Sequence, residues 1–536
     1  MKLTIEELKN TEPWHRAGVS LPDYDVNVVR TNAKTTPVWL HFGIGNIFRI
    51  FIGSIADRLM AEGSLTSGLI CAETYDFEVV DKIYKPYDNL ELSVILNPDG
   101  TQSRRVLAPF AEALCAAPGF TEDWQRLCDV FRSSSLQMVS FTITEKGYSL
   151  KGADGTYSKA ARADFDNGPQ RPILAIPIVT AQLYERFKAG RYPLALVSMD
   201  NCSHNGERLR EAVLTVGRAW VSKGYCPEEF LTYLEDTTKV SFPWTMIDKI
   251  TPRPEPEVAE SLESLGIDGM NIVTTDKMTF IAPFGNAEKV QYLVVEDAFP
   301  NGRPALEDAG VYMTDRDTVN RAERMKVCTC LNPIHTALCT YDCMLGYDMF
   351  ADGMKDPELS RLAHRIGYTE GLPVVTDPGI ISPRAFLDEV IQERMPNPYL
   401  GDTSQRIAVD ISQMVGIRFG VTIRAYVERF GSASELVGIP LAIAGWLRYL
   451  LAVDDQGEPF GLAPDPMIPE LQRQMAAIRL GQPESVGSSL HPILSNENIF
   501  GINLYQAGIG NKIEEMFRKE IGGIGAVRET LKLYLD

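Results

Sequence analysis

The chain has 536 residues, of which 45% are hydrophobic and 23% are charged, a composition typical of a soluble globular protein. Its 52 basic and 71 acidic residues give a formal charge of −19, which argues against binding to a polyanion such as nucleic acid. A small anionic substrate is not excluded, because it needs only a few local cations. The length is too great for one ordinary core and predicts two large domains.

Nothing in the sequence indicates a membrane or secreted protein. The first residues, MKLTIEELKN, are charged and lack the apolar core of a signal peptide. The most apolar helical stretch, residues 437–453, contains Pro440 and Arg448, so we interpret it as a buried helix. Nine scattered cysteines indicate reduced thiols. We expect a cytoplasmic protein with no nucleic-acid or membrane partner, as a monomer or small homo-oligomer.

The first half of the chain alternates apolar strand-like runs with helical segments, which predicts an α/β domain. PVWLHFGIG (37–45) is predicted to be a strand that enters a glycine turn, and residues 46–63 a helix. Further strands are predicted at 67–74, 90–96, 136–144 and 192–200. The polar stretch 153–173 is rich in Gly, Asp and Pro and predicts a surface loop.

Beyond Tyr312 the pattern changes to helical periodicity, broken at 377–383, 396–402 and 463–469 by Pro and Gly. The last strand-like run of the first half is VQYLVVEDAF (290–299). We therefore predict two domains, 1–318 and 319–536, the second mostly α-helical.

The glycine turn HFGIGNIFR predicts a dinucleotide site. Gly43 permits a tight turn, and Gly45 allows the backbone to approach a pyrophosphate at a helix N-terminus, although Phe48 replaces the third glycine of the usual fingerprint. Glu73 and Asp76 follow the next strand at the interval where an acid binds the adenosine ribose, which favours NAD over NADP. The predicted cofactor-binding residues are Gly43, Ile44, Gly45, Asn46, Phe48, Arg49, Glu73 and Asp76. The alternative is a plain strand–helix turn with acidic surface residues.

Seven stretches in order resemble the long-chain polyol-specific dehydrogenases, and they cover roughly residues 38 to 450. They are HFGIGNIFR, FTITEKGY (141–148), MDNCSHNG (199–206), MIDKITP (246–252), VVEDAFPNGRPALEDAGV (294–311), ERMKVCTCLNPIH (323–335) and NPYLGDTSQRI (397–407). The resemblance implies a Rossmann-type NAD-binding N-terminal domain, a helical C-terminal domain, an active site in the cleft between them and no metal.

The resemblance also implies roles for individual residues. Lys326 matches the family's general acid/base, and a lysine can serve near neutral pH where burial or a nearby cation lowers its pKa. Asn332 and Asn201 match donors to the reacting oxygen, and His335 a ligand of a substrate hydroxyl. Glu145 resembles an acid on a proton path, and Asp248 and Arg406 match substrate contacts. Without the resemblance, we would interpret Lys326 as a surface lysine and Asn201 as a turn residue.

Three departures from the family pattern bear on the site. Five residues instead of four separate Lys326 from Asn332, so an unbroken helix would turn Lys326 and His335 to opposite sides. Because Pro333 can host a kink and a π-bulge absorbs one residue, we predict an irregular helix near residues 331–333. Lys249 replaces a family arginine, and Met414 replaces a lysine whose substrate contact nearby Arg418 is expected to take over.

Two other readings compete with this one. Cys328, Cys330, His335, Cys339 and Cys343 offer soft ligands for zinc, but Cys-x-Cys leading into a helix matches structural zinc sites poorly. A catalytically silent nucleotide-binding protein on the same fold is the second reading. The resemblance favours an enzyme that uses NADH to interconvert D-fructuronate and D-mannonate, with Arg406, Lys249 and Arg418 as cations for the carboxylate. Mannitol or other polyol dehydrogenase and tagaturonate reductase are the alternatives.

Overall fold

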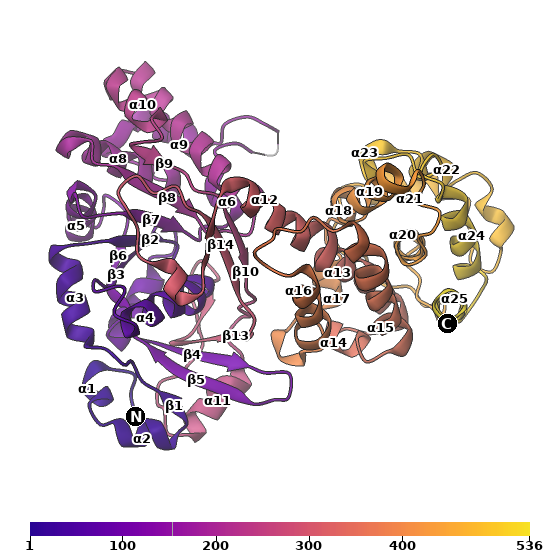
Figure 1. Cartoon of the computed structure of the whole chain (residues 1–536), viewed down its shortest axis with the longest axis horizontal. Helices are drawn as coiled ribbons and strands as arrows, with labels where there is room; N and C mark the ends of the chain where they lie inside the picture. The colour runs from indigo at the N-terminus through magenta and orange to yellow at the C-terminus, as the bar shows by residue number, and fades with distance from the viewer. Residues whose placement is uncertain (153) are drawn as a thin grey trace. The chain divides into compact units, whose positions relative to one another are not determined.

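The computed structural model describes every residue except 153 and divides into two compact units, Met1–Asn320 and Arg321–Asp536 (Figure 1). The predicted boundary after residue 318 falls two residues before this division. Within the described residues, no helix combines the length and the apolar character needed to cross a membrane.

The N-terminal unit is built on a six-stranded parallel sheet (Figure 1). Its strands are β2 (Trp39–Phe42), β3 (Leu69–Glu73), β6 (Phe110–Cys115), β7 (Met138–Phe141), β8 (Leu194–Ser198) and β9 (Val240–Ser241). Their order across the sheet is β6-β3-β2-β7-β8-β9, with every pair parallel. In chain order this is 3-2-1-4-5-6, the arrangement of a dinucleotide-binding domain. The predicted Rossmann-type fold is confirmed.

Helices cover both faces of this sheet, and alternate strand residues feed two separate cores. Leu40 and Phe42 pack with helices α5 (Thr121–Arg132), α8 (Ala175–Gly190) and α9 (Asn205–Ser222). Trp39 faces the other way and packs with the π-helix η1 (Phe48–Ile52) and α4 (Gly53–Ala61). The strands are buried on both faces, as is usual for a parallel sheet.

Smaller sheets account for the remaining strands of this unit. The predicted strand 90–96 is β4 (Glu91–Leu96), which lies between β5 (Gln102–Leu107) and β13 (Phe284–Ala287) and not in the dinucleotide sheet. A third sheet joins β10 (Thr245–Asp248), β14 (Tyr292–Glu296) and β15 (Tyr312–Thr314), and a short hairpin joins β11 (Val273–Thr274) to β12 (Phe280–Ile281).

The prediction of a surface loop at 153–173 was wrong over the middle part of this stretch. Residue 153 itself lies outside the described residues. Residues Lys159–Asn167 form helix α7, whose first turn is capped by the Ser158 hydroxyl. Ala161 and Phe165 are buried four positions apart on one face of this helix. The polar composition of the stretch concealed this short apolar face.

The C-terminal unit is helical, as predicted. Its central helices are α13 (Asn332–Leu345) and α20 (Gly438–Tyr449), which pack against each other. Every residue of α20 is buried, which confirms that the most apolar run of the sequence is a core helix. Gly445 makes the contact close, because a Cβ there would lie 2.4 Å from the ring of Tyr341.

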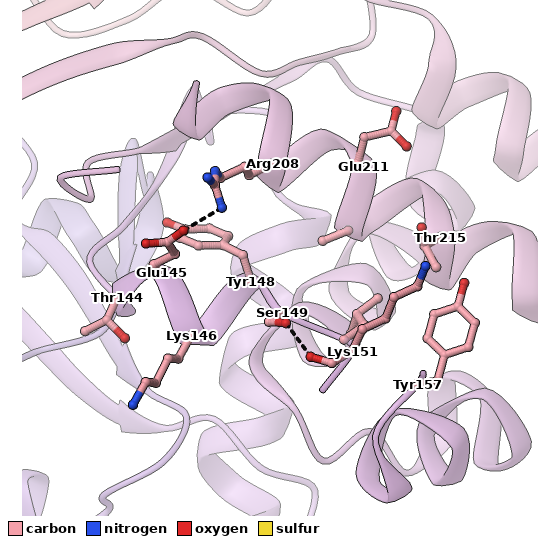
Figure 2. A pocket seen from close by; sticks show the side chains of 12 residues that line it. Thr144, Glu145, Lys146, Tyr148, Ser149, Lys151, Tyr157, Arg208, Glu211 and Thr215 are labelled. Atoms are coloured by element: carbon pink, nitrogen blue, oxygen red, sulfur yellow. Dashed lines mark hydrogen bonds and ion pairs between the residues drawn. The ribbon is translucent and has the colours of Figure 1, made fainter. Parts of the chain in front are cut away.

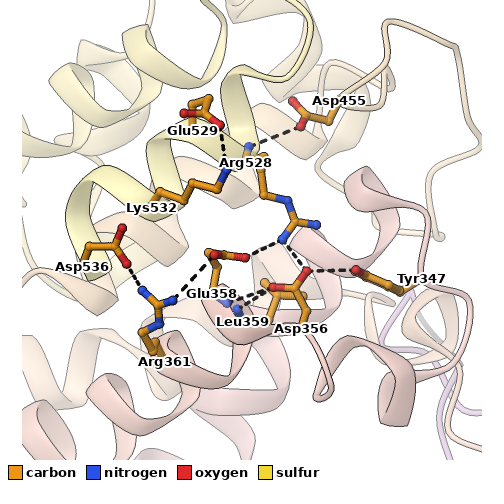
Figure 3. Close-up of polar contacts among 10 residues, drawn as sticks. All are labelled: Tyr347, Asp356, Glu358, Leu359, Arg361, Asp455, Arg528, Glu529, Lys532 and Asp536. Carbon is orange, nitrogen blue, oxygen red and sulfur yellow. Dashed lines mark hydrogen bonds and ion pairs between the residues drawn. The ribbon is translucent and has the colours of Figure 1, made fainter.

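The last helix, α25 (Ala526–Leu535), is fixed to α15 (Pro357–His364) by a polar network (Figure 3). Asp356 caps α15 by accepting from the backbone of Glu358 and Leu359, and it also accepts from Tyr347 at 2.9 Å. The Arg528 guanidinium pairs with Asp356 and, at 2.8 Å, with Glu358. One arginine of α25 therefore neutralises the acidic first turn of α15.

We predict that the stability of the C-terminal unit depends on pH through Glu520, the last residue of helix α24 (Gly510–Glu520). The Tyr341 hydroxyl lies 2.7 Å from the Leu441 carbonyl and 2.6 Å from the Glu520 carboxyl. The Tyr341 and Glu520 side chains are both fully buried. Tyr341 has one proton, so both contacts are hydrogen bonds only when Glu520 is protonated. Burial raises the pKa of Glu520 to about 8.

Because the folded pKa is raised, this contribution to stability is complete below the ordinary value of 4.5 and is lost as the pH rises through about 8. We expect Glu520→Gln to match the parent protein at pH 5 and to exceed its unfolding free energy at pH 8.5, by up to about 1.4 kcal/mol for each pH unit between the two pKa values. Thermal unfolding at both pH values measures the difference. An equal difference at pH 5 and 8.5 contradicts a protonated Glu520.

Candidate functional site

The two glycines of the turn after β2 differ in conformation and in surroundings. Gly43 has φ +90°, and a Cβ there would lie 2.1 Å from the carbonyl oxygen of Thr142, so only glycine fits against the loop after β7. Gly45 faces open space. Because β2 and β7 are the strands where the order of the sheet reverses, this open space lies where dinucleotides bind in such folds. The turn therefore fits a dinucleotide.

His41 on β2 supports the glycine turn through buried hydrogen bonds. It was not identified from the sequence. It is fully buried, stacks on Phe48 at 4.0 Å, and lies 2.6 Å from the Ser140 hydroxyl and 2.8 Å from that of Thr142. Thr142 donates its one proton to the Gly43 carbonyl at 2.8 Å, so His41 Nε2 must donate to Thr142 and Nδ1 must accept from Ser140. Burial lowers the pKa of His41, which matches this neutral form.

The two acidic residues predicted to bind the adenosine ribose have different hydrogen-bond partners. Glu73, the last residue of β3, accepts from the backbone N–H of Ile44 at 3.3 Å and from those of its own loop, including Tyr75 at 2.8 Å. Its carboxylate thus faces the glycine turn. Asp76 is turned to the β11–β12 hairpin, where it accepts from the Thr275 hydroxyl at 2.6 Å. Glu73 is therefore the better placed of the two for a ribose.

Three predicted cofactor contacts have side chains that are fully buried, namely Ile44, Phe48 and Arg49. The Arg49 guanidinium pairs with Glu91 on β4 and lies 3.2 Å from the Asn46 side chain. Burial raises the pKa of Glu91 to about 7 although Arg49 opposes this. With these side chains buried, a cofactor would meet the backbone of the three residues, and their part in cofactor binding stays a prediction.

Glu145 lies on the short helix α6 (Thr144–Tyr148) after β7, and Asn201 lies on the loop after β8. Asp200 holds these two segments together. Asp200 accepts from the backbone of Ile143 and Thr144 at 3.0 and 2.9 Å and from the Tyr148 hydroxyl at 2.5 Å. Asn201, next along the chain, is exposed. Asp200 and its contacts, unnoticed in the sequence, set the position of the loop that carries Asn201.

Glu145 lies in a surface cavity of about 930 Å³ (Figure 2). Its carboxylate pairs with Arg208 of α9 at 2.6 Å, and the two side chains are 60% and 47% exposed. Lys146 and Tyr148 also line this cavity. The structure thus places Glu145 in an exposed ion pair, and its role on a proton path stays a prediction.

Asp248 ends β10 and is buried. The Lys249 amine donates to the Glu288 carbonyl and lies 3.3 Å from the Gln291 side-chain oxygen. Both residues therefore sit at the end of the β10–β14 pair, and their roles toward a substrate stay predictions.

The helix around Lys326 is irregular, as predicted from the extra residue. Lys326–Cys330 form the π-helix η6, and the Leu331 N–H donates to the Lys326 carbonyl at 3.0 Å, a bond that spans five residues. Leu331 then leaves helical geometry with φ −124°, and α13 begins with Pro333 in its first turn. Lys326 is 2% exposed, which rules out the reading of a surface lysine.

The start of α13 presents the remaining predicted residues of this unit. Asn332 and His335 are half-buried and three positions apart, hence on one face, and the His335 ring meets Phe350 edge-on at 4.9 Å. The buried Thr336 hydroxyl, next along the helix, accepts from Arg418 at 2.5 Å. Arg406 of α17 (Ser404–Ile407) is 65% exposed and paired with Asp402. The structure thus places Asn332 and His335 on one face of α13, and Arg418 of α18 against Thr336.

Of the four cysteines around His335, Cys328, Cys330 and Cys339 are buried thiols and Cys343 is half-buried. Burial raises the pKa of Cys328 to about 11 and those of Cys330 and Cys343 to about 12, which disfavours the thiolate that zinc requires. The Cys339 thiol donates to the Thr336 carbonyl at 3.4 Å. Across the described residues, no three His, Cys, Asp or Glu side chains are grouped as metal ligands.

Both units match domains of known proteins. Residues 38–308 match the mannitol dehydrogenase Rossmann domain, and residues 318–519 match the mannitol dehydrogenase C-terminal domain. A D-mannonate oxidoreductase of Thermotoga maritima is 50% identical over 99% of this chain and 98% of its own. The D-mannonate oxidoreductase of Escherichia coli is 30% identical over 63% of this chain and 64% of its own.

A solved structure of Pseudomonas fluorescens mannitol 2-dehydrogenase, in a ternary complex with NAD and D-mannitol, is 25% identical. It covers 99% of each chain with a TM-score of 0.70. A D-sorbitol dehydrogenase in substrate-free form is also 25% identical, with a TM-score of 0.78 over 98% of this chain and 99% of its own. The chain therefore belongs to the mannitol dehydrogenase family.

Proposed function

We propose that the protein is an NAD-dependent oxidoreductase that interconverts D-fructuronate and D-mannonate without a metal. The observation that carries this proposal is the 50% identity, over nearly the whole chain, to a protein named D-mannonate oxidoreductase. The dinucleotide is assigned to the N-terminal unit, where Gly45 leaves space at the glycine turn and Glu73 faces it. The predicted active site between the two domains is part of this proposal.

In the direction of reduction, bound NADH supplies a hydride to the carbonyl carbon of the substrate. The Lys326 ammonium donates a proton to the carbonyl oxygen, which becomes the hydroxyl of the product. Asn332 and Asn201 donate hydrogen bonds to the same oxygen and stabilise the negative charge that develops on it. His335 holds a neighbouring hydroxyl, and in the oxidation direction the neutral lysine takes the proton back. The burial of Lys326 supports this role, because water is kept from the amine.

We also propose a cytoplasmic location with a small sugar acid as substrate. The nine cysteines are free thiols, seven of them buried, which supports a reducing compartment. Mannitol or another polyol remains the second candidate, because the solved mannitol 2-dehydrogenase complex has the same fold over 99% of the chain. Tagaturonate differs from fructuronate only in hydroxyl stereochemistry.

NADH oxidation with D-fructuronate, D-tagaturonate and D-fructose, measured side by side, tests the substrate. We expect kcat/KM for D-fructuronate to exceed that for D-fructose by at least about 100-fold, because the uncharged ketose offers no carboxylate to the cations predicted to bind it. NADPH in place of NADH is expected to be the poorer donor, since Glu73 repels a 2′-phosphate. Preference for D-fructose would overturn the sugar-acid assignment and leave the proton-transfer roles in place.

A further inference from the structure

A fully buried ion pair lies next to the glycine turn. Arg49 belongs to the first turn of the helix that follows Gly45, since its N–H donates to the Gly45 carbonyl at 3.1 Å. Its guanidinium donates through Nε to the Glu91 carboxylate at 2.8 Å, and through Nη2 to the same carboxylate and to the Ala282 carbonyl. The Arg49 and Glu91 side chains are 0% and 2% exposed. Most of the donors of Arg49 thus have partners inside the protein.

The remaining nitrogen of this guanidinium orients a polar side chain of the turn. Arg49 Nη1 lies 3.2 Å from the side-chain oxygen of Asn46. A guanidinium has donors and no acceptor, so the Asn46 amide can meet it only through that oxygen. The NH2 group of Asn46 therefore points away from Arg49, and in the part of the chain that the structure describes it has no protein acceptor. Asn46 is half-buried and follows Gly45, which borders open space. Its two amide donors are thus left for a ligand of the turn.

The partners of Arg49 come from a sheet other than the dinucleotide sheet. Glu91 is the first residue of β4, and Ala282 lies two residues before β13. These two strands pair with each other, outside the six-stranded sheet. The guanidinium is a planar fork, so its bonds to Glu91 and Ala282 fix the plane of the group and with it the direction of Nη1. The second sheet therefore sets the orientation of the Asn46 amide.

Stability alone does not account for this ion pair. The removal of two charges from water costs about as much as their attraction returns, and apolar residues of similar volume often stabilise a core equally well. Burial raises the pKa of Glu91 to about 7 although Arg49 opposes this, and the buried Glu91 Oε1 has no partner in the described residues. The orientation of Asn46 is a contribution that apolar residues could not make.

We propose that Arg49 and Glu91 are positioning residues for the dinucleotide, because the ion pair holds the Asn46 amide with its N–H groups toward the pyrophosphate. This inference rests on the proposed function. A pyrophosphate offers several anionic oxygens as acceptors, and in folds of this kind it lies at the N-terminus of the first helix, where Asn46 is. Arg49 and Glu91 together add no net charge, so they contribute orientation rather than attraction. The affinity for NADH should then depend on the pair only while residue 46 is an asparagine.

The Kd for NADH, measured by fluorescence titration in a double-mutant cycle, tests this dependence. Asn46→Ala removes the amide donors, and we expect a rise in Kd of about 10-fold. Arg49→Met with Glu91→Leu removes both charges together, and a rise of about 5-fold is expected because the amide is no longer held. All three substitutions combined should raise Kd by no more than about 10-fold, the effect of Asn46→Ala alone. ADP-ribose, which keeps the pyrophosphate and lacks the nicotinamide, should show the same pattern by calorimetry.

Arg126→Met with Glu112→Leu is the matched control, since it removes a partly buried ion pair of the same unit between α5 and β6, and its Kd should equal that of the parent protein. If removal of the Arg49 pair raises Kd as much in the Asn46→Ala background as in the parent protein, the pair supports the whole domain and the inference fails while the proposed function stands. An unchanged Kd for Asn46→Ala or for the pair variant overturns the inference as well. If the pair variant does not fold, Arg49→Lys replaces it, because a lysine keeps the charge and cannot bridge Glu91 and Asn46, and equal rises in both backgrounds again overturn the inference. A parent protein that binds neither NADH nor ADP-ribose overturns the proposed cofactor and this inference together.

Discussion

Replacing Lys326 by methionine is expected to lower kcat with D-fructuronate by about 10³-fold, within the range that general acid–base catalysis contributes. Lys326 is 2% exposed and begins a π-helix, so methionine keeps the buried stem and removes only the amine. The Kd for NADH is expected to stay within about twofold, because the glycine turn and Glu73 belong to the other unit. Single-turnover NADH oxidation and NADH fluorescence titration measure the two quantities.

The pH profile distinguishes proton transfer from a loss of packing. In the parent protein the rate should depend on the ionisation of one group that Lys326→Met removes, and the residual rate of the variant should lose that limb. Lys355→Met, at a lysine that is 68% exposed and pairs with Asp352, is the control and should keep the parent rate. A Lys326→Met variant with more than a tenth of the parent kcat would show that another group transfers the proton.

The strand, glycine turn and helix of the dinucleotide site could be predicted from the sequence because each has a local signal. Apolar residues from Trp39 to Phe42 precede Gly43 and Gly45, and helical spacing follows. The order of the strands has no such signal, since parallel pairing depends on contacts between residues far apart in the chain. For the same reason, the sequence did not place β4 in a separate sheet. The predictable parts of this fold are those encoded within about 20 residues.

Side-chain partners of the site were harder to predict than its backbone. His41 appeared in the sequence only as part of a strand, because its partners Ser140 and Thr142 lie about 100 residues away. Asp76 has the spacing of a ribose ligand, yet its carboxylate is bound to Thr275, almost 200 residues away. The π-helix at Lys326, in contrast, followed from counting one extra residue before Pro333. Spacing along one helix can be predicted, whereas long-range hydrogen bonds cannot.

Arg186 of α8 is expected to contribute strongly to the stability of the N-terminal unit. It is fully buried, and its five N–H groups donate to five carbonyl oxygens at 2.7 to 2.9 Å, those of Phe131, Ser133, Leu136, Tyr192 and Pro193. These carbonyls belong to the segments that enter β7 and β8. Burial lowers the pKa of Arg186 to about 10, so it remains charged at neutral pH.

Arg186→Met removes five hydrogen bonds. The carbonyls of Ser133, Leu136 and Tyr192 keep a second donor, from Leu136 N–H, Asn301 and Tyr233 respectively. The carbonyls of Phe131 and Pro193 therefore bear most of the cost, about 1–3 kcal/mol for each unmet group where water cannot reach it. Because some carbonyls will relax toward water, we expect a loss of about 4–5 kcal/mol in the unfolding free energy of this unit, measured by urea denaturation with circular dichroism. Arg132→Met is the matched control, since that arginine is 41% exposed and pairs with Glu185, and a loss below about 1 kcal/mol is expected for a surface ion pair. Arg186→Lys, with three donors in place of five, should fall between the two. Equal stabilities of the Arg186→Met and Arg132→Met variants would mean that the carbonyls find water as readily as they find the guanidinium, and that the segments entering β7 and β8 are held by their packing alone.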